Sequence, residues 1–334
     1  MIRFRMPAEW TAHDAVWTAW PHDPEQWLEG LEAPQRALMA MVSAIADAGR
    51  GERVELLVRH DDDERSARDL LGAAAAHVRF HHGPYGDVWL RDTGPIFVTR
   101  GSELAAARFG FDGWGGKYVM AGDAEVADRV AAWARVTGAR FDFVLEGGAV
   151  DVDGDGTVLT TKQCLLGGAR NPGLDADALE ARLRWSLGAE RIVWLDRGLI
   201  NDHTDGHIDT IARFVAPGVV TCMEPAPGDP NRDALDAIIA ELRAQRFELA
   251  LLPSPGEVVD ASGAVMPASY TNFYIANTTV VVPTYGVAAD DAAVAAIAKM
   301  FPSRRVVGVA GKPVVVGGGA FHCATQQQPA TVAS

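Results

Sequence analysis

Apolar and polar residues recur along this chain with two different periods. In the segment 34–48 apolar residues fall three and four positions apart, at Leu38, Met41, Val42 and Ile45, which is typical of a buried helix face. The segments 54–58 and 78–81 are short and rich in apolar residues, and they predict strands. Further helices are predicted over 64–76, 124–137, 175–187, 232–245 and 290–300, with strands between them.

A strand–turn–strand–helix–strand unit recurs about five times, although the repeats share little sequence identity. In each unit a polar residue occupies a similar place in the first hairpin: Asp92, Glu146, His207, Asn272 and Cys323. Their spacing of 51 to 65 positions is typical of radial or stacked repeats. We therefore predict an α/β fold, a five-bladed α/β propeller of ββαβ-type units around a central site. No linker or shift in composition interrupts the chain, so we expect a single domain over residues 1–334.

The segment 317–323 combines three consecutive glycines with a cysteine. Residues 314–316 predict a short buried strand, and the glycines after it allow a sharp turn and a close approach of the backbone. Cys323 at the end of this turn is placed where a small molecule can reach its thiol. A lone cysteine is more often a buried structural residue, so the other units of the repeat must decide between these interpretations.

Composition restricts the classes of partner. The chain has 334 residues, of which 48% are hydrophobic and 22% charged, as in an ordinary folded protein. The formal net charge of -14 argues against nucleic acid and anionic membranes as partners. A small cationic ligand is compatible with this charge.

The three cysteines, Cys164, Cys222 and Cys323, form no C-x-x-C pair, which favours a reducing compartment. Charged and polar residues follow the basic first residues at once, unlike a secretory signal, and no apolar run approaches the ~20 residues of a membrane span. We therefore expect a cytoplasmic protein.

Motifs for nucleotides and metals are missing or incomplete. The sequence has neither G-x-x-x-x-G-K-[ST] nor a strand-placed G-x-G-x-x-G, and neither H-E-x-x-H nor paired C-x-x-C. Residues 151–156 begin like a calcium loop, but Lys162 stands where a bidentate Glu is needed. Their Asp and Gly residues favour a hairpin turn, and we predict no metal.

If the five units converge, the centre holds a thiol, an imidazole and three carboxylates. His207 and Asp209 are two positions apart on a predicted strand, so both point to one side. Carboxylates beside a cysteine would raise the pKa of the thiol unless a cation binds between them. A planar guanidinium matches paired carboxylates best, and its charge would favour the reactive thiolate.

These side chains are sufficient for hydrolysis of a guanidinium through a covalent intermediate. Cys323 attacks the central carbon, charged His207 gives a proton to the departing ammonia, and the neutral imidazole then activates water. Asp92 and Asp209 clamp the guanidinium nitrogens, while Glu146 orients His207 or shares the clamp.

Each residue also has a structural alternative. Taken alone, His207 is more often a core histidine whose hydrogen bonds are satisfied. Taken alone, Asn272 is typical of a turn. Trp89 is more often part of a core than the wall of a binding site. Their joint placement in five repeats favours the functional interpretation, with Trp89 and Asn272 as further substrate-binding candidates.

Seven stretches along nearly the whole chain resemble the agmatine deiminase and Porphyromonas-type peptidyl-arginine deiminase family, a branch of the guanidine-modifying pentein superfamily. They are residues 6–10, 17–21, 89–95, 145–148, 204–209, 269–277 and 317–329. The resemblance implies a propeller with a closed central site, no cofactor, a cysteine-bound amidino intermediate and the roles given above. Ala320 and Phe321 depart from the family pattern Gly-Gly-Gly-Asn-Ile-His-Cys, beside the expected site.

Substrate choice depends on the far end of the substrate. Agmatine carries a distal ammonium, suited to carboxylates or to the face of Trp89 or Trp114, whereas arginine carries a carboxylate that needs a basic partner. No arginine is an evident partner, although Arg213 and Lys117 are candidates. We expect agmatine, with C-terminal peptidyl-arginine or free arginine as the alternative.

Three further points stay open from the sequence. A guanidine-binding protein and an amidinotransferase are lesser alternatives to the hydrolase. The Gly-rich loop with Lys117 is a candidate lid over the site. The family resemblance favours a homodimer or a larger homo-oligomer.

Overall fold

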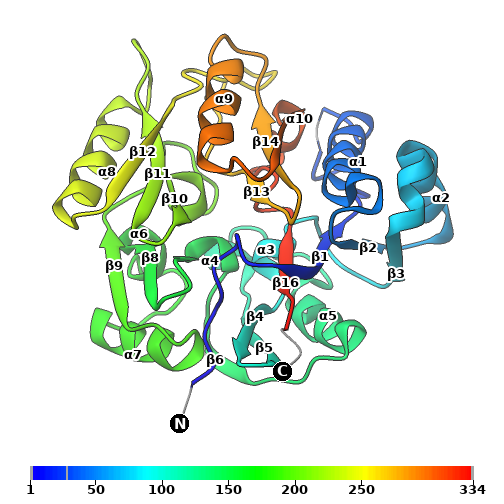
Figure 1. The fold of residues 1–334 in the computed structure, drawn as a ribbon, viewed down its shortest axis with the longest axis horizontal. Helices are drawn as coiled ribbons and strands as arrows, with labels where there is room; N and C mark the ends of the chain where they lie inside the picture. Colours follow the sequence, from blue (N-terminus) through cyan, green and yellow to red (C-terminus); the bar gives the residue numbers. More distant parts are fainter. Residues whose placement is uncertain (1–2, 28, 332–334) are drawn as a thin grey trace.

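Five small sheets surround a common centre in the computed structural model, which describes residues 3–27 and 29–331 (Figure 1). Two of them are β4 (Ile96–Arg100), β5 (Glu103–Gly110) and β6 (Arg140–Val144), and β7 (Asp151–Val152), β8 (Thr157–Thr161) and β9 (Arg191–Leu195). Two more are β10 (Ala212–Ala216), β11 (Val219–Glu224) and β12 (Glu248–Pro253), and β13 (Tyr274–Ile275), β14 (Thr279–Thr284) and β15 (Arg305–Ala310). The fifth has the order β16 (Gln326–Pro329), β1 (His13–Ala19), β2 (Arg53–Val58) and β3 (Val78–His82).

Each blade begins with an antiparallel pair and continues with a parallel strand. A parallel neighbour needs a crossover connection, and a helix supplies it in every blade. These helices are α5 (Val126–Ala134), α7 (Ala176–Ser186), α8 (Arg232–Ala244) and α9 (Asp290–Met300), with α1 (Glu32–Ala46) and α2 (Asp61–Leu71) in the fifth blade. The repeat predicted from the apolar pattern is thus confirmed.

The burial of the strands shows which end of each blade faces the centre of the ring. The first strands, such as β10, β13 and β16, are almost entirely buried, whereas nearly all residues of the third strands β12 and β15 are partly or fully exposed. The first strand of each blade therefore lies at the centre of the ring and the third at its rim. The predicted five-bladed α/β propeller is confirmed.

The two ends of the chain share one blade. Strand β16 pairs antiparallel with β1, with Trp17 opposite Gln326, and the indole of Trp17 donates to Gln328 Oε1 at 3.0 Å. Figure 1 shows β16 in red beside β1 in blue. This pairing closes the ring and places the segment before β16, with Cys323, at its centre.

Two predicted strands next to the centre are helical turns instead. Residues 314–316 belong largely to α10 (Lys312–Val315), which has Pro313 in its first turn. A further short helix at the centre, α3 (Leu90–Thr93), contains Asp92. Residues 208–210 form a 3₁₀ turn, so the predicted strand around His207 and Asp209 is wrong. Most residues of these segments are buried, and burial alone does not distinguish a turn from a strand.

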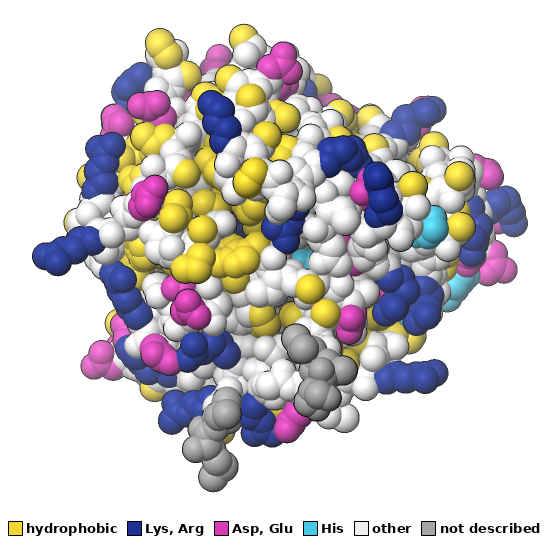
Figure 2. Space-filling model, in the orientation of Figure 1, with side chains coloured by type: hydrophobic (Ala, Val, Ile, Leu, Met, Phe, Trp, Pro, Cys, Tyr) yellow, Lys and Arg dark blue, Asp and Glu magenta, His cyan; other side chains and the backbone are white. Residues whose placement is uncertain are grey.

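The remaining short elements connect the blades. They are α4 (Gly113–Gly116), α6 (Lys162–Leu165) and the 3₁₀ turns Asp47–Gly49, Gly72–His77, Asp123–Glu125, Gly147–Ala149 and Ile208–Thr210. Figure 2 shows basic and acidic side chains interspersed around the edge of one face of the molecule. No helix within residues 3–27 and 29–331 has both the length and the hydropathy of a transmembrane span.

Candidate active site

The five polar residues of the repeat all precede the first strand of their blade. Asp92 lies before β4, Glu146 before β7, His207 before β10, Asn272 before β13 and Cys323 before β16. Because these strands line the centre of the ring, the segments that enter them meet there. All five side chains are buried.

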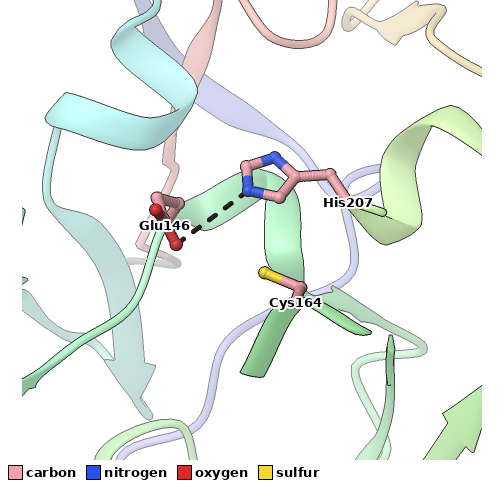
Figure 3. A group of neighbouring side chains, drawn as sticks. All are labelled: Glu146, Cys164 and His207. Atoms are coloured by element: carbon pink, nitrogen blue, oxygen red, sulfur yellow. Dashed lines mark ion pairs between the residues drawn. The ribbon is translucent and has the colours of Figure 1, made fainter. Parts of the chain in front are cut away.

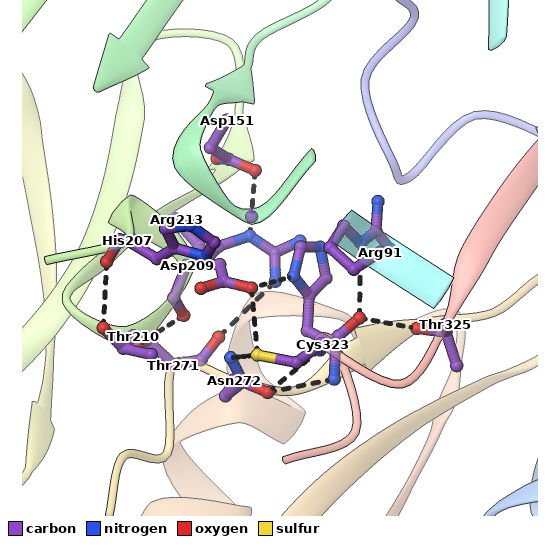
Figure 4. Close-up of polar contacts among 12 residues, drawn as sticks. Arg91, Asp151, His207, Asp209, Thr210, Arg213, Thr271, Asn272, Cys323 and Thr325 are labelled. Carbon is purple, nitrogen blue, oxygen red and sulfur yellow. Dashed lines mark hydrogen bonds and ion pairs between the residues drawn. The ribbon is translucent and has the colours of Figure 1, made fainter. Parts of the chain in front are cut away.

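The turn with Cys323 is held by Asn272. The Asn272 side-chain oxygen accepts hydrogen bonds from the backbone N–H groups of His322 and Cys323, and its Nδ2 donates to Cys323 Sγ at 3.1 Å (Figure 4). The same sulfur lies 3.4 Å from Asp209 Oδ2. The sequence predicted Asn272 as a substrate-binding residue, and in the structure its side chain contacts the turn that carries Cys323.

Burial raises the pKa of the Cys323 thiol well above its usual value, and the nearby Asp209 and Asp92 carboxylates raise it further. The hydrogen bond from Asn272 acts in the opposite direction but does not offset them. At neutral pH the thiol of the free protein is therefore protonated.

His207 is fully buried and close to two carboxylates. Its Nδ1 lies 3.8 Å from Asp92 Oδ1 and its Nε2 3.9 Å from Glu146 Oε2, beyond hydrogen-bond range (Figure 3). Neither nitrogen has a hydrogen-bond partner among the described residues. Burial lowers the pKa of His207 to about 3, so the imidazole of the free protein is neutral. The sequence analysis had predicted a charged imidazole.

Asp92 is oriented by two donors. The backbone N–H of Gly148 and the indole N–H of Trp114 each donate to one of its oxygens at 3.0 Å. Burial raises the pKa of Asp92 well above its usual value, and the charges of Asp209 and Glu146 add to this effect. A cation at this point would relieve all three effects.

Asp209 differs from Asp92 in being held ionised. Burial opposes its charge, but the hydrogen bond from His322 Nδ1 at 2.7 Å and the charge of His322 prevail, and the pKa of Asp209 is lowered. Its other oxygen, Oδ1, is buried and has no hydrogen-bond partner in the described parts of the chain. One oxygen of this carboxylate is thus free to accept from a ligand.

Gly148 marks the point at which these groups meet. A Cβ atom there would lie 2.5 Å from His207 Nδ1, 2.9 Å from Asp92 Oδ1 and 3.1 Å from Asp209 Oδ2. Three functional groups from two distant segments of the chain therefore surround a single backbone position, and only glycine leaves them room.

Glu146 is paired with Arg170, a residue that the sequence analysis did not identify. Arg170 Nε lies 2.7 and 2.9 Å from the two oxygens of Glu146, and its Nη2 donates to the carbonyl of Thr204 at 2.6 Å. Burial raises the pKa of Glu146, while Arg170 opposes that rise. Arg170 fixes Glu146 behind His207, and no spacing in the sequence indicated this.

Cys164 joins Glu146 and His207 in a group whose ligand atoms all lie within 4.8 Å of one another (Figure 3). These residue types are able to hold a metal ion. However, the guanidinium of Arg170 already neutralises Glu146 and would repel a second cation. Burial also keeps the pKa of the Cys164 thiol well above its usual value. This group therefore fits a metal poorly.

A cavity of 910 Å³ leads to Cys323 and Asp92, with Trp89 and Trp114 on its wall. Trp89 packs closely against the turn, since a Cβ on Gly319 would lie 2.7 Å from its ring. Acidic side chains also line the cavity, several of them at its exposed end: Glu25, Glu29, Asp87, Asp202 and Asp260.

The basic residues near this cavity are already paired. Lys117 Nζ donates to the carbonyl of His203 at 2.5 Å and to Asp205 Oδ1 at 2.8 Å. Arg213 is buried away from the cavity and binds Glu9 and Asp151. Among the described residues that line the cavity there is no arginine.

A five-bladed α/β propeller with a buried cysteine, a histidine and carboxylates at its centre defines the pentein class of guanidine-modifying enzymes. A model of the Porphyromonas-type peptidyl-arginine deiminase family matches residues 5–329. The chain belongs to that family, which confirms the resemblance seen in the sequence.

Named relatives agree with this assignment. The chain is 37% identical to the agmatine deiminase of Pseudomonas fluorescens, with 98% of this chain and 96% of that protein covered. It is similar to the solved agmatine deiminase of Enterococcus faecalis with a TM-score of 0.90, 33% identity and coverage of 98% and 96%. A substrate-bound variant of the C. jejuni agmatine deiminase has a TM-score of 0.90, 27% identity and coverage of 97% and 96%.

Proposed function

We propose that this protein hydrolyses the guanidinium group of agmatine to N-carbamoylputrescine and ammonia through a covalent intermediate on Cys323. The observation that carries the proposal is the contact of the Cys323 sulfur with Asp209, at the end of a cavity that Asp92 also lines. Similarity to agmatine deiminases over nearly the whole chain supports the same activity.

Binding is the step that activates the site. The substrate guanidinium lies between Asp92 and Asp209, and its charge offsets the carboxylates that otherwise keep the Cys323 thiol protonated. Asp209 Oδ1, which has no partner among the described residues, is a ready acceptor for one guanidinium N–H. The clamp also holds the central carbon near the sulfur.

The chemistry then follows in two halves. His207 takes up the thiol proton, the thiolate of Cys323 forms a bond to the guanidinium carbon, and the imidazolium returns that proton to the departing nitrogen, which leaves as ammonia. In the second half His207 takes a proton from water, the hydroxide attacks the same carbon and the C–S bond breaks. The imidazolium of His207 returns its proton to the Cys323 thiolate. The ureido product leaves, and the proton that it gives up converts ammonia to ammonium.

The other predicted residues support these steps. Glu146, fixed by Arg170, stabilises the imidazolium of His207 from 3.9 Å. Asn272 holds the sulfur, and its N–H donor favours the thiolate. Trp89 forms an apolar wall for the carbon chain of the substrate.

The pH dependence of the thiol tests the activation step. Because the pKa of Cys323 is raised in the free protein, we expect the ultraviolet absorbance of its thiolate to be missing at pH 7 and to grow only in strongly alkaline buffer. A small guanidinium compound that is not turned over should move this transition to lower pH. The difference between wild type and Cys323→Ser isolates the signal, and a thiolate at pH 7 in the free protein would contradict this step.

Asp87 is the residue that we expect to recognise the ammonium of agmatine. It lines the cavity, accepts from the indole N–H of Trp89 at 2.8 Å, and has no basic hydrogen-bond partner among the described residues. Burial raises the pKa of Asp87 to about 7, and the nearby Asp123 adds to this, so a cationic ligand would restore its charge.

Asp87→Asn keeps an acceptor for Trp89 but removes the charge. We expect KM for agmatine to rise roughly 10-fold or more, with a smaller change in kcat. Asp14→Asn, on the exposed side of β1, is the matched control and should leave KM unchanged. A fall in kcat alone would indicate that Asp87 acts only through Trp89.

Deimination of C-terminal peptidyl-arginine or free arginine is the second candidate, because the matched family is described as peptidyl-arginine deiminases. The cavity lining favours agmatine, since its described residues include carboxylates and no arginine that could bind a substrate carboxylate. Incubation with agmatine, arginine and an arginine-terminated peptide, with assay of ammonia and ureido product, decides between them. Ureido product from arginine but not agmatine would overturn the proposed substrate.

Further properties stay predictions. A guanidine-binding protein without turnover needs neither the thiol nor the imidazole, and an amidinotransferase would require an amine in place of water. We also propose a single catalytic domain over residues 1–334, supported by the pairing of β16 with β1. Homo-oligomeric assembly, a cytoplasmic location and a lid at Lys117 stay predictions.

A further inference from the structure

His322 lies between two carboxylates at the back of the site. Its Nδ1 is 2.7 Å from Asp209 Oδ2, and its Nε2 is 2.8 Å from Glu9 Oε2. All three side chains are buried, and they come from three distant segments of the chain. The sequence analysis treated residue 322 only as part of the motif before Cys323.

The two contacts define the protonation of this histidine. An ionised carboxylate only accepts hydrogen bonds, so both ring nitrogens must carry a hydrogen, which makes the ring an imidazolium. The pKa of Glu9 is held well below its usual value: burial opposes its charge, but Arg213, His322 and Arg91 outweigh burial.

The surrounding charges balance. Arg91 Nη2 lies 3.2 Å and Arg213 Nη2 3.0 Å from oxygens of Glu9, and Arg91 Nε also donates to the backbone carbonyl of His322. Asp151 binds Arg213 on its other side. The cluster therefore consists of three cations, His322, Arg91 and Arg213, and three anions, Glu9, Asp151 and Asp209. Figure 4 shows Asp151, Arg213 and Asp209 of this cluster beside the thiol of Cys323.

The arrangement leaves one acceptor unused. Asp209 Oδ2 is taken by His322 and by the thiol of Cys323, while Oδ1 is buried without a partner among the described residues. A carboxylate fixed through one oxygen keeps the direction of the other. Oδ1 is therefore the oxygen of Asp209 that is left to accept from a guanidinium.

We propose that His322, held as an imidazolium by Glu9, is a positioning residue that keeps the Asp209 carboxylate ionised and turned so that Oδ1 receives the substrate guanidinium. The proposal rests on the proposed function, because it assigns Asp209 to the substrate clamp. The string Glu9, His322, Asp209 and substrate then alternates in charge from the interior of the protein to the ligand.

His322→Gln tests this role. Glutamine donates to one carboxylate but carries no charge and does not bridge two. Asp209 would then lose its cationic partner, its pKa would rise, and it would become protonated as the pH falls through a higher value. We expect the acid limb of the kcat/KM profile for agmatine to move to higher pH.

We expect kcat/KM at pH 7 to fall by about 10²-fold, with a clear rise in KM. Glu9→Gln keeps an acceptor for His322 but removes its charge, so the limb should move in the same direction by less. His82→Gln is the matched control, because it removes an exposed histidine paired with Glu64 at 2.6 Å; its profile should equal that of wild type. Melting temperatures separate loss of positioning from loss of fold.

Nitrogen-15 spectra of the histidine-labelled wild-type protein provide a measurement that needs no turnover. Of the 9 histidines, the one that carries a hydrogen on both ring nitrogens between two carboxylates should give a signal that is missing in His322→Gln. If that variant does not fold, the same signal should change in Glu9→Gln, where the ring loses one of its two ionised acceptors. A neutral His322 at pH 7 in wild type, or an unmoved acid limb in a folded His322→Gln, overturns the proposal. Failure to turn over agmatine with a cationic His322 present would instead reject the proposed substrate.

Discussion

Replacement of Cys323 by alanine is expected to reduce turnover of agmatine by about 10⁴-fold or more, because the covalent route loses its nucleophile. The clamp of Asp92 and Asp209 remains, and removal of the thiol leaves their charges in place. The variant should therefore still bind agmatine, with a dissociation constant within about tenfold of the wild-type KM. Ammonia release and isothermal titration measure the two quantities.

Cys222→Ala is the matched control for this experiment. Cys222 is also a buried free thiol, but it lies in β11 within the apolar cluster of the third blade. Its loss should cost about 1 kcal/mol of stability or slightly more and leave turnover intact. Turnover that persists in Cys323→Ala would remove the proposed mechanism, whichever substrate is used.

Gly148→Ala is expected to have the next largest effect. The added methyl group would occupy the space 2.5 Å from His207 Nδ1 and 2.9 Å from Asp92 Oδ1, well inside normal contact distance. Displacing the imidazole and one arm of the clamp by even a fraction of an ångström misaligns the reacting groups. We expect kcat/KM to fall by at least about 10²-fold, as measured by steady-state assay.

Gly110→Ala is the control for adding a methyl group near the centre. Its Cβ would lie 3.4 Å from the carbonyl oxygen of Phe143 and from the side chain of Val144, which is ordinary contact. Both variants should show similar melting temperatures if the effect at Gly148 is local. Equal activities in the two variants would show that activity does not depend on the free space between Gly148 and the side chains of His207 and Asp92.

Some functional residues became evident only in three dimensions. Arg170 lies 24 positions from Glu146, and no shared motif links the two. Trp114 was already a candidate from the sequence, but its hydrogen bond to Asp92, 22 positions away, was not evident there. His322 was visible beside Cys323, but nothing in the sequence pairs it with Glu9, which is 313 positions away. Contacts of this kind form only when the ring closes, and the periodicity of apolar residues along the chain does not predict them.

Charge states also depended on burial. The residue types indicated an imidazole beside a thiol, and a charged imidazole was expected. The structure surrounds His207 with protein on all sides and gives it no hydrogen-bond partner among the described residues, so the neutral form prevails before substrate binds. The pKa of a group depends on its desolvation and neighbours, and these are tertiary properties.

The sequence by itself determined the repeated unit, the number of blades and the five residues that precede the innermost strands. This was possible because the spacing of apolar residues reflects which side of each helix or strand is buried. In addition, each repeat has its polar residue at the corresponding position, before its first strand. Only the tertiary structure decided which side chains hold these residues in place, since those partners meet through closure of the ring by β16 and β1. Only the structure showed that the thiol and the imidazole are both neutral before a cationic substrate binds, because their charge states depend on how deeply the ring buries them.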